Sequence, residues 1–219
     1  MADFFDTWKS GCIPPPLEYY QFKASYHEAG HAVIAYLHGA CIDSLEISKS
    51  DASGCIRAHF LLSKAFRKNL AWGIRQKSLI KESREEMINK ILKARLDIHL
   101  AGLVAEELIF GIANFETGRS DLRNFHIDVG KLLKKTATGS EVLAMRKHHW
   151  QACEKELAEN WEWVERIAAE LFDRKFLLHQ DVQRLRQEKL YSSEVDLFGE
   201  VIYVDFANKN RICDDDVIS

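Results

Sequence analysis

The chain has 219 residues and a formal net charge of −3 at pH 7, with 30 lysines and arginines against 33 aspartates and glutamates. Hydrophobic residues make up 47% and charged residues 29% of the sequence, which is typical of a globular protein that buries a core. This balance argues against nucleic-acid binding, because nucleic-acid-binding proteins present clustered basic charge.

The N-terminal residues predict an arm that precedes the folded domain. All three prolines stand together at residues 14–16, so we expect an arm with a proline-rich linker over residues 1–20. We expect one domain over residues 21–190 and a C-terminal tail over 191–219, with a strand-like stretch at 201–204. Early acidic residues argue against a secretory signal, and no apolar run approaches the ~18 residues that span a bilayer, so we expect a soluble, cytoplasmic protein.

The first regular elements follow directly. Apolar residues at helical spacing predict a helix over residues 22–38, ended by Gly39 as a C-terminal cap. Apolar and polar residues then alternate over residues 42–48 and again over 54–60, with a polar turn between them. We therefore expect a small antiparallel β unit after the first helix.

The rest of the domain reads as helical. Ser83 and Glu86 form a capping-box pattern that predicts the start of a long helix ending at Gly111. A third helix is predicted to open at Ser120 and Asp121, a fourth to run from about 140 to 172, and a short one over 180–188. The predicted fold class is therefore mainly α with a small antiparallel β unit.

A metal-binding pattern lies within the first predicted helix, where residues 27–31 read HEAGH, an HExxH motif. Residues four apart lie one above the other on a helix, so His27 and His31 can bind the same cation. Zinc suits imidazole nitrogen and lowers the pKa of a bound water to about 7. Glu28 beside it can accept the proton of that water, which is the chemistry of amide hydrolysis.

A chance occurrence is the alternative explanation of this motif. Two histidines on a helix can be exposed or hydrogen-bonded without any metal, and the chain would then be a helical interaction domain. The apolar surroundings of the motif favour a metal site, because ionisable residues in a core-facing segment are costly unless they have a use.

Four segments, in order, resemble the peptidase domain of the FtsH family, the proteolytic half of a membrane-bound AAA protease. They are residues 26–33 (YHEAGHAV), 99–111 (HLAGLVAEELIFG), 117–122 (TGRSDL) and 159–185, and the similarity covers roughly residues 22 to 188. The resemblance implies a helical, zincin-like peptidase fold and a zinc metalloendopeptidase that hydrolyses peptide bonds in proteins or peptides.

The resemblance also implies roles for individual residues. It makes His27, His31 and Asp121 the ligands of Zn²⁺ and Glu28 the general base. A carboxylate oxygen is an accepted zinc ligand. The alternative for Asp121 or Ser120 is a helix N-cap without contact to metal. Glu106 and Glu107 compete as third ligands, but the family pattern makes them structural, buried and paired.

The chain departs from the family in lacking a GxxxxGK[ST] sequence, so we expect an activity that is ATP-independent by itself. A separate ATPase or protease partner that delivers substrate, and a homo-oligomer, are both compatible with this. Retention of Glu28 beside both histidines favours an enzyme. The alternative function is a non-catalytic binding or regulatory module for another protease.

The other candidate ligands have no motif support. His38 lies ~10 Å along the helix from His31, too far for the same metal, and is expected to be a site-wall or surface residue. The remaining histidines are expected to be exposed or hydrogen-bonded. The five cysteines form no CxxC pair and are expected to be reduced and buried.

Overall fold

The computed structural model describes residues 16–60 and 77–187, without the side chains of residues 59, 60 and 77–84. Contacts group residues 1–185 into one unit and residues 186–219 into a second, of which only residues 186 and 187 are described. Most of the predicted arm, and the tail with its strand-like stretch at 201–204, lie outside the described residues. The description below concerns the first unit.

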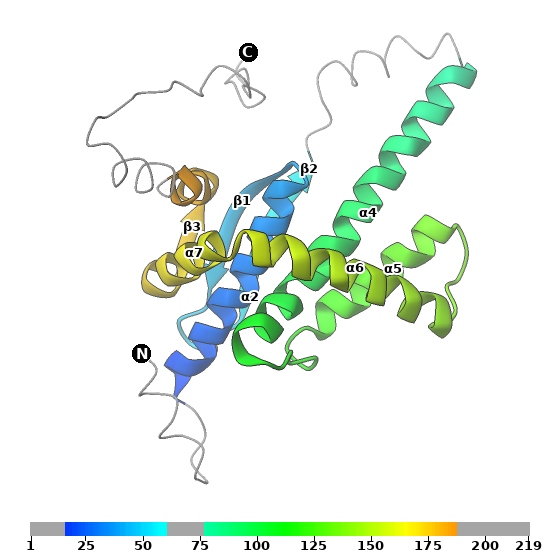
Figure 1. Ribbon diagram of the computed structural model, residues 1–219. Coiled ribbons are helices and arrows are strands. Elements are labelled where there is room, and N and C mark those ends of the chain that lie inside the picture. Colours follow the sequence, from blue (N-terminus) through cyan, green and yellow to red (C-terminus); the bar gives the residue numbers. More distant parts are fainter. Residues whose placement is uncertain (1–15, 61–76, 188–219) are drawn as a thin grey trace, which may run out of the picture. The chain divides into compact units, whose positions relative to one another are not determined.

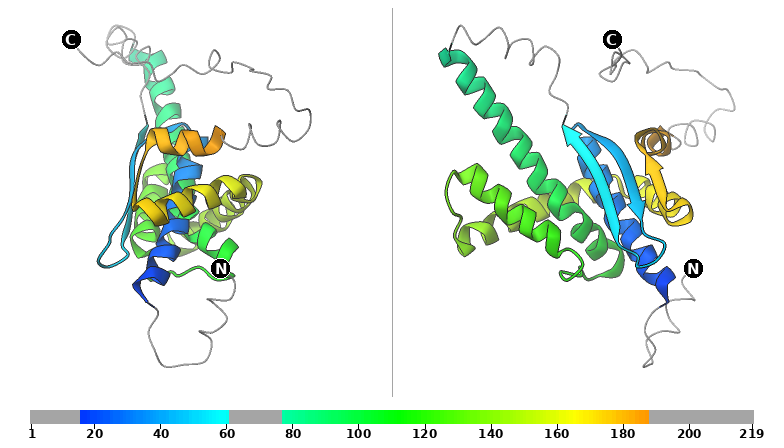
Figure 2. Two further views of the ribbon diagram at one scale, coloured as in Figure 1. Left: turned by 90° about the vertical axis from the view of Figure 1, so that its left-hand side faces the viewer. Right: turned by 180° about the vertical axis from the view of Figure 1, so that it is seen from behind.

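The arrangement of this unit is mainly helical with a small antiparallel sheet, as predicted. Helix α2 (Leu17–Leu37) is the central element and contacts α4 (Lys77–Phe110), α7 (Trp161–Arg174) and strands β1 (Ala40–Ile47) and β2 (Gly54–Phe60). The sheet lies along one flank of the helices (Figures 1 and 2). Helix α2 therefore contacts both the other helices and the sheet, so residues on different faces of α2 can contact either of them.

Helix α2 begins at Leu17, five residues before the predicted start at 22. Its N-cap is Pro16, with φ −61° and ψ 158°, so the helix starts where the proline run ends. A proline at this boundary is tolerated because the first N–H groups of a helix have no intrahelical acceptor. Gly39 follows the helix with a φ of 77°, which supports its prediction as the residue that ends the helix.

The sheet has the strand order β2-β1-β3, and both pairs are antiparallel. Strands β1 and β2 confirm the predicted β unit, whereas β3 (Phe176–Leu178) was not predicted. Three residues are too few for alternation to be recognised, although Leu177 is buried between two exposed neighbours. Among the described residues β2 has a strand on one side only, so its other edge, here called the open edge, has no described strand partner.

Helix α4 begins at Lys77, not at the predicted capping box. Ser83 is an internal residue of the helix, so the prediction that it caps the N-terminus is wrong. A capping pattern cannot exclude helix on its N-terminal side when the preceding residues also favour helix. Near its other end α4 packs closely on α2, where a Cβ added to Gly30 would lie 2.6 Å from the carbonyl oxygen of Ala101. Gly30 therefore permits this close approach of the two helices.

The predicted fourth helix is two helices. α6 (Gly139–Glu159) begins at a capping box formed by Thr138 and Glu141, and α7 begins at Trp161. The break lies at Asn160, whose φ of −116° is not helical and whose side chain donates a hydrogen bond to the carbonyl of Glu156. The apolar pattern continues across this break, so periodicity alone did not reveal it.

One hydrophobic core joins these elements. α5 (Arg119–Leu133) and a helix over residues 179–187 complete the described fold. Fully buried side chains come from every layer, including Ile34, Leu45, Leu100, Phe125, Leu157, Ile167 and Leu177. None of the helices in the described ranges combines the length and the apolar character needed to cross a membrane.

Candidate metal centre

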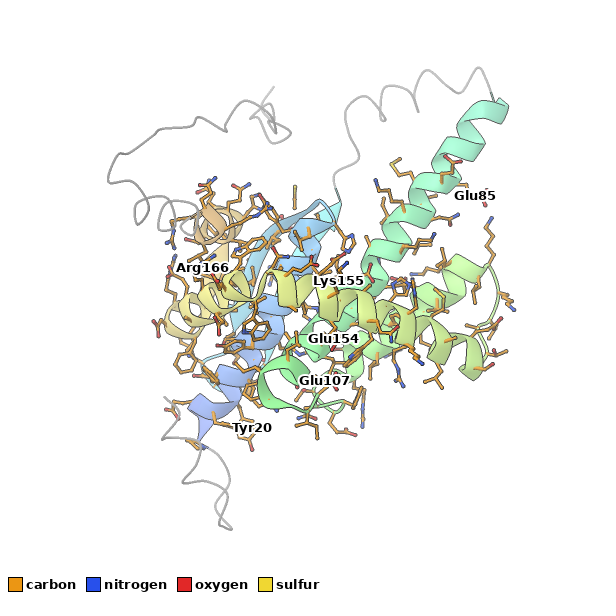
Figure 3. All side chains as sticks on the ribbon, in the orientation of Figure 1. Tyr20, Glu85, Glu107, Glu154, Lys155 and Arg166 are labelled. Atoms are coloured by element: carbon orange, nitrogen blue, oxygen red, sulfur yellow. The ribbon has the colours of Figure 1, made fainter. Side chains whose placement is uncertain are left out.

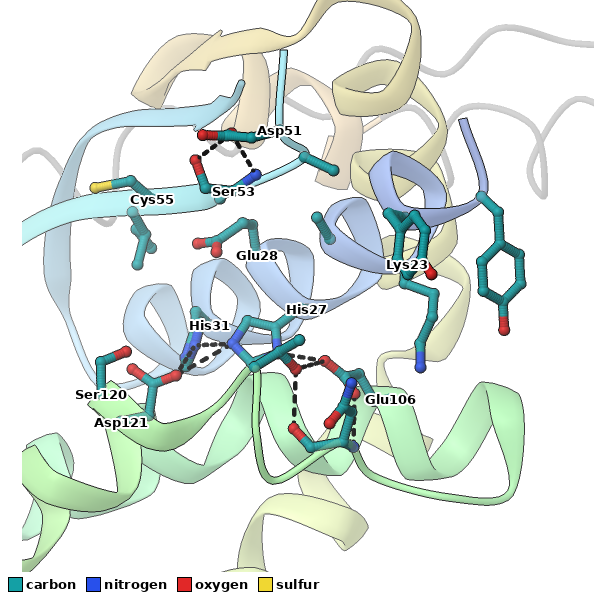
Figure 4. A pocket seen from close by; sticks show the side chains of 18 residues that line it. Lys23, His27, Glu28, His31, Asp51, Ser53, Cys55, Glu106, Ser120 and Asp121 are labelled. Atoms are coloured by element: carbon teal, nitrogen blue, oxygen red, sulfur yellow. Dashed lines mark hydrogen bonds and ion pairs between the residues drawn. The ribbon is translucent and has the colours of Figure 1, made fainter. Parts of the chain in front are cut away.

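Helix α2 brings the three residues of the motif to its buried middle. His27, Glu28 and His31 are all buried, with relative exposures of 8%, 5% and 4%. The two imidazoles lie one turn apart and face α4 and the start of α5, whereas Glu28 lies on the side of β2 (Figure 4). The helical period thus separates two predicted ligands from the predicted base.

The three predicted ligand residues converge on one point. The Nε2 atoms of His27 and His31 are 3.0 Å apart, and Asp121 Oδ2 lies 3.2 Å from the first and 3.6 Å from the second. Ligand atoms 2.0–2.2 Å from a tetrahedral zinc ion lie about 3.3–3.6 Å from one another. The donor types suit zinc, and the observed separations of 3.0–3.6 Å are close to this range.

The outer nitrogen of each ring fixes which nitrogen faces this point. His31 Nδ1 lies 2.6 Å from the carbonyl oxygen of Ile98, which can only accept a hydrogen bond, so Nδ1 is the donor. His27 Nδ1 lies 2.8 Å from Glu106 Oε1 and donates to that carboxylate. In the neutral rings both Nε2 atoms then carry lone pairs, and these face each other and Asp121. Three converging lone pairs repel one another, so this arrangement calls for positive charge between them, either a metal ion or a proton on Nε2.

The charges around His27 agree with this requirement. Although burial lowers the pKa of His27, the hydrogen bonds to Asp121 and Glu106 raise it to about 10. Burial also acts to raise the pKa of Asp121, but its contacts with the two histidines hold that pKa below its ordinary value. The carboxylates thus favour positive charge at the point where the ring nitrogens meet.

Asp121 reaches this point from the first turn of α5. The N-cap of that helix is Gly118, and no side chain caps its free N–H groups. The alternative that Asp121 or Ser120 serves as the N-cap is therefore wrong. Instead, the Asp121 carboxylate contacts both imidazoles.

Glu28 has a carboxylate with one oxygen available for a reaction. Its Oε2 atom is buried and has no hydrogen-bond partner among the described residues. Burial raises the pKa of Glu28, while the neighbouring histidines lower it and Asp121 raises it further. A buried carboxylate without a partner is costly, so this atom is expected to face water or a substrate.

Two glycines leave the space that these side chains occupy. A Cβ added to Gly102 would lie 2.5 Å from His27 Nε2 and 2.6 Å from His31 Nε2. A Cβ added to Gly54 would lie 2.3 Å from Glu28 Oε1. All three distances are shorter than van der Waals contact, so a side chain at either glycine position would displace a functional group.

A pocket of about 590 Å³ opens over this centre. Its wall includes His27, His31, Asp121 and Glu28, together with residues of the β1–β2 turn and β2 and residues from the first turns of α2 (Figure 4). The candidate metal centre is therefore accessible from outside. A pocket of this size accommodates several residues of an extended peptide.

The sequence did not reveal the role of Glu106. It is buried as predicted, but it also fixes His27, and its Oε2 atom accepts a hydrogen bond of 2.9 Å from the backbone N–H of Asn114. The prediction that Glu107 is buried is wrong, because Glu107 is exposed and accepts a hydrogen bond from Trp150 (Figure 3). Adjacent helix positions point about 100° apart, so only one of the two glutamates can face α2.

The histidines and cysteines that were not predicted to bind metal lie outside the metal centre. His38 does not line the pocket and instead contacts Asp97, at 3.3 Å, so the site-wall alternative is wrong. Cys153 is buried as predicted, Cys41 is partly buried, and Cys55 is exposed at the pocket, which contradicts the prediction for that residue. Cys55 lines the pocket from strand β2.

Comparison of the chain with models of known protein families and with curated proteins finds no match.

Proposed function

We propose that the chain is a zinc-dependent metallopeptidase that hydrolyses peptide bonds in loosely folded proteins or peptides and needs no ATP by itself. The convergence of His27 Nε2, His31 Nε2 and Asp121 Oδ2 carries this proposal, because all three ligand atoms lie within 4.8 Å of one another. The similarity of four segments to the FtsH peptidase domain supports the same function. A chance HExxH sequence would give no reason for a carboxylate oxygen from another helix to lie beside the two imidazole nitrogens.

His27, His31 and Asp121 would hold the ion, and Glu106 would keep His27 oriented toward it. A bound zinc ion supplies Lewis-acid chemistry, polarising the peptide carbonyl and making water acidic. Outer carboxylates of this kind fix the tautomer of a ligating histidine and raise its basicity. With three protein ligands, the ion would be able to take a reactant as well.

Glu28 would move the proton. Its partnerless oxygen can accept a proton from the attacking water and then donate it to the nitrogen of the leaving amine. The raised pKa suits this exchange, because a carboxyl group that is too acidic releases a proton easily but accepts one poorly.

The open edge of β2 would hold the substrate. Gly54, Cys55 and Ile56 of β2 line the pocket, so an extended peptide that paired with this edge would pass over the metal centre. Pairing through the backbone selects extended segments rather than a particular sequence. A structure with bound peptide and no pairing along β2 would contradict this part of the proposal.

Delivery by a separate ATPase or protease partner, assembly into a homo-oligomer and a cytoplasmic location stay predictions from the sequence. The alternative function is a non-catalytic binding or regulatory module that keeps the fold, with or without the metal. The two functions differ in one measurable property, the turnover of peptide.

Zinc content and cleavage of casein or a peptide library test the proposal. We expect the wild type to bind one zinc per chain and to cleave, Glu28→Gln to keep zinc without cleaving, and His31→Ala to lose both. Zinc binding with no cleavage by the wild type would favour the non-catalytic module. Absence of zinc from the folded wild type would contradict the metallopeptidase.

A further inference from the structure

Lys23 stands apart from the other side chains of the pocket. Among the described residues it is the only lysine or arginine in the pocket wall, which also contains the carboxylates of Glu28, Asp51, Glu106 and Asp121. It precedes His27 by four residues, so it lies about 6 Å along the same face of α2. A substrate that reached the metal centre along this face would pass Lys23.

The position of the Lys23 ammonium group is partly fixed. Its Nζ lies 5.0 Å from the centre of the Phe110 ring, a favourable cation–π distance, and the side chain is partly buried. Figure 4 shows the amine pointing into the space between α2 and the end of α4. Packing against an aromatic ring reduces the freedom that a lysine must lose when it binds a ligand.

The nearby carboxylates do not use this charge fully. Within residues 16–60 and 77–187 Lys23 forms no ion pair within 4 Å, although its charge helps to lower the pKa of Glu106. Glu106 is already bound by His27 and by the backbone of Asn114, and Asp121 by the two histidines. Asp51 accepts hydrogen bonds from Ser53 in the β1–β2 turn. None of the described carboxylates therefore takes the ammonium donors in an ion pair.

We propose that Lys23 determines specificity by binding a carboxylate of the peptide substrate, close to the bond that is cleaved. Tyr19 and Tyr20 line the same pocket, and their rings contact each other edge-on with centroids 5.7 Å apart. An ammonium group held over an aromatic ring next to two tyrosines suits a carboxylate better than a neutral or basic side chain. This inference rests on the proposed peptidase function.

The carboxylate has two possible sources, an aspartate or glutamate side chain or the C-terminus of the peptide. Peptides of one sequence distinguish them: one with glutamate and an amidated C-terminus, one with glutamine and a free C-terminus, and one with glutamine and an amidated C-terminus. Preference for the first identifies a side chain, and preference for the second identifies a C-terminus.

Binding to the zinc-loaded Glu28→Gln form, measured by fluorescence anisotropy, tests recognition without turnover. We expect a carboxylate-bearing peptide to bind about tenfold more tightly than the neutral one, the range of a charged hydrogen bond that is partly exposed. Lys23→Met, which keeps the stem on Phe110, should abolish this difference. Lys23→Glu should reverse it in favour of a lysine-bearing peptide, whereas Lys147→Met, at an exposed lysine on α6 outside the pocket, should leave it unchanged.

The outcomes separate this inference from the peptidase function. Equal binding of all peptides, no binding of any peptide, or a preference that survives in Lys23→Met would overturn the role of Lys23. If Lys23→Met weakens zinc affinity but leaves the peptide preference intact, Lys23 only balances the charge of Glu106, and the inference also fails. Carboxylate preference in binding without cleavage by the wild type would support Lys23 as a recognition residue and count against the peptidase.

Discussion

In the described part of the chain, two groups of histidines and carboxylates lie between α2, α4 and their neighbours, and one of them has the geometry of a metal site. In the candidate metal centre, ring nitrogens and a carboxylate meet at one point within 4.8 Å. In the second group, which we call the His38 cluster, His38 and His149 contact opposite oxygens of Asp97, at 3.3 and 2.6 Å, and Glu156 lies 3.6 Å from His38.

The difference between the two groups lies in where their nitrogen and oxygen atoms point. In the His38 cluster the two rings contact opposite oxygens of Asp97, so their nitrogens do not converge on one point. In the metal centre the Nδ1 atoms face Glu106 and the Ile98 carbonyl, and both Nε2 atoms face one another and Asp121. Residue composition is thus a poor guide to a metal site, whereas the direction of each ring nitrogen is a good one.

The largest expected effect follows from the space at Gly102. In Gly102→Ala the added methyl group would collide with both Nε2 atoms, so the rings must move apart. We expect zinc affinity to fall by more than about 100-fold, the upper range for changes that disturb only outer contacts. Zinc titration monitored by a competing chelator measures it, with circular dichroism to verify folding.

The matched control is Gly139→Ala, where a Cβ would meet nothing within 4 Å. It should bind zinc like the wild type. Unchanged zinc affinity in Gly102→Ala would show that the two ring nitrogens do not share an ion.

Glu106→Gln tests the support of His27 and should have a smaller effect. The amide can retain one hydrogen bond to the ring or the loop but loses the negative charge, so zinc affinity should fall about 10- to 100-fold. Glu107→Gln is the matched control, because its side chain is exposed and contacts Trp150. Equal affinities for the two variants would remove Glu106 from the metal centre.

The smallest effect is expected in the His38 cluster. His38→Ala should keep zinc and lower the free energy of unfolding by about 1 kcal/mol, the size of one partly exposed polar contact. The contact with Asp97 raises the pKa of His38, burial opposes this, and Glu156 adds to it. A raised folded-state pKa gives stability that is complete below the unfolded pKa of about 6.5 and is lost as pH rises through the folded value.

Urea unfolding of His38→Ala and wild type across pH 5–9 measures this loss. The difference between them should shrink toward alkaline pH. His126→Ala, at an exposed histidine, should show no such trend. A difference that grows as pH rises, or loss of zinc in His38→Ala, would mean that the His38 cluster also requires a cation.

Sequence patterns predicted the parts of the fold that depend on local periodicity. The helix around His27, the two long strands and the predominance of helix follow from apolar spacing alone. The break at Asn160 and the short strand β3 depend on tertiary packing, which periodicity does not report. The early start of α4 reflects a capping pattern that occurred inside a helix.

In the candidate site, too, some features follow from local periodicity and others depend on tertiary packing. His27 and His31 are four residues apart, so their proximity follows from helix geometry. Asp121 comes from 90 residues further along the chain, and only resemblance to a family selected it from many acidic residues. Nothing in the sequence distinguishes Glu106 from Glu107, because the choice depends on how α4 is rotated against α2.

The loop after α4 sets the distance between Glu106 and Asp121. Glu106 accepts hydrogen bonds from the backbone of Asn114 and the hydroxyl of Thr117, so the same carboxylate that orients a histidine also shapes the turn leading to the third ligand. Inserting or deleting one residue between 111 and 118 would rotate α5 relative to this anchor and carry Asp121 out of reach. The length of this loop therefore matters to the metal centre as much as the identity of its ligands. We expect the loop to tolerate insertions and deletions less well than other surface turns do.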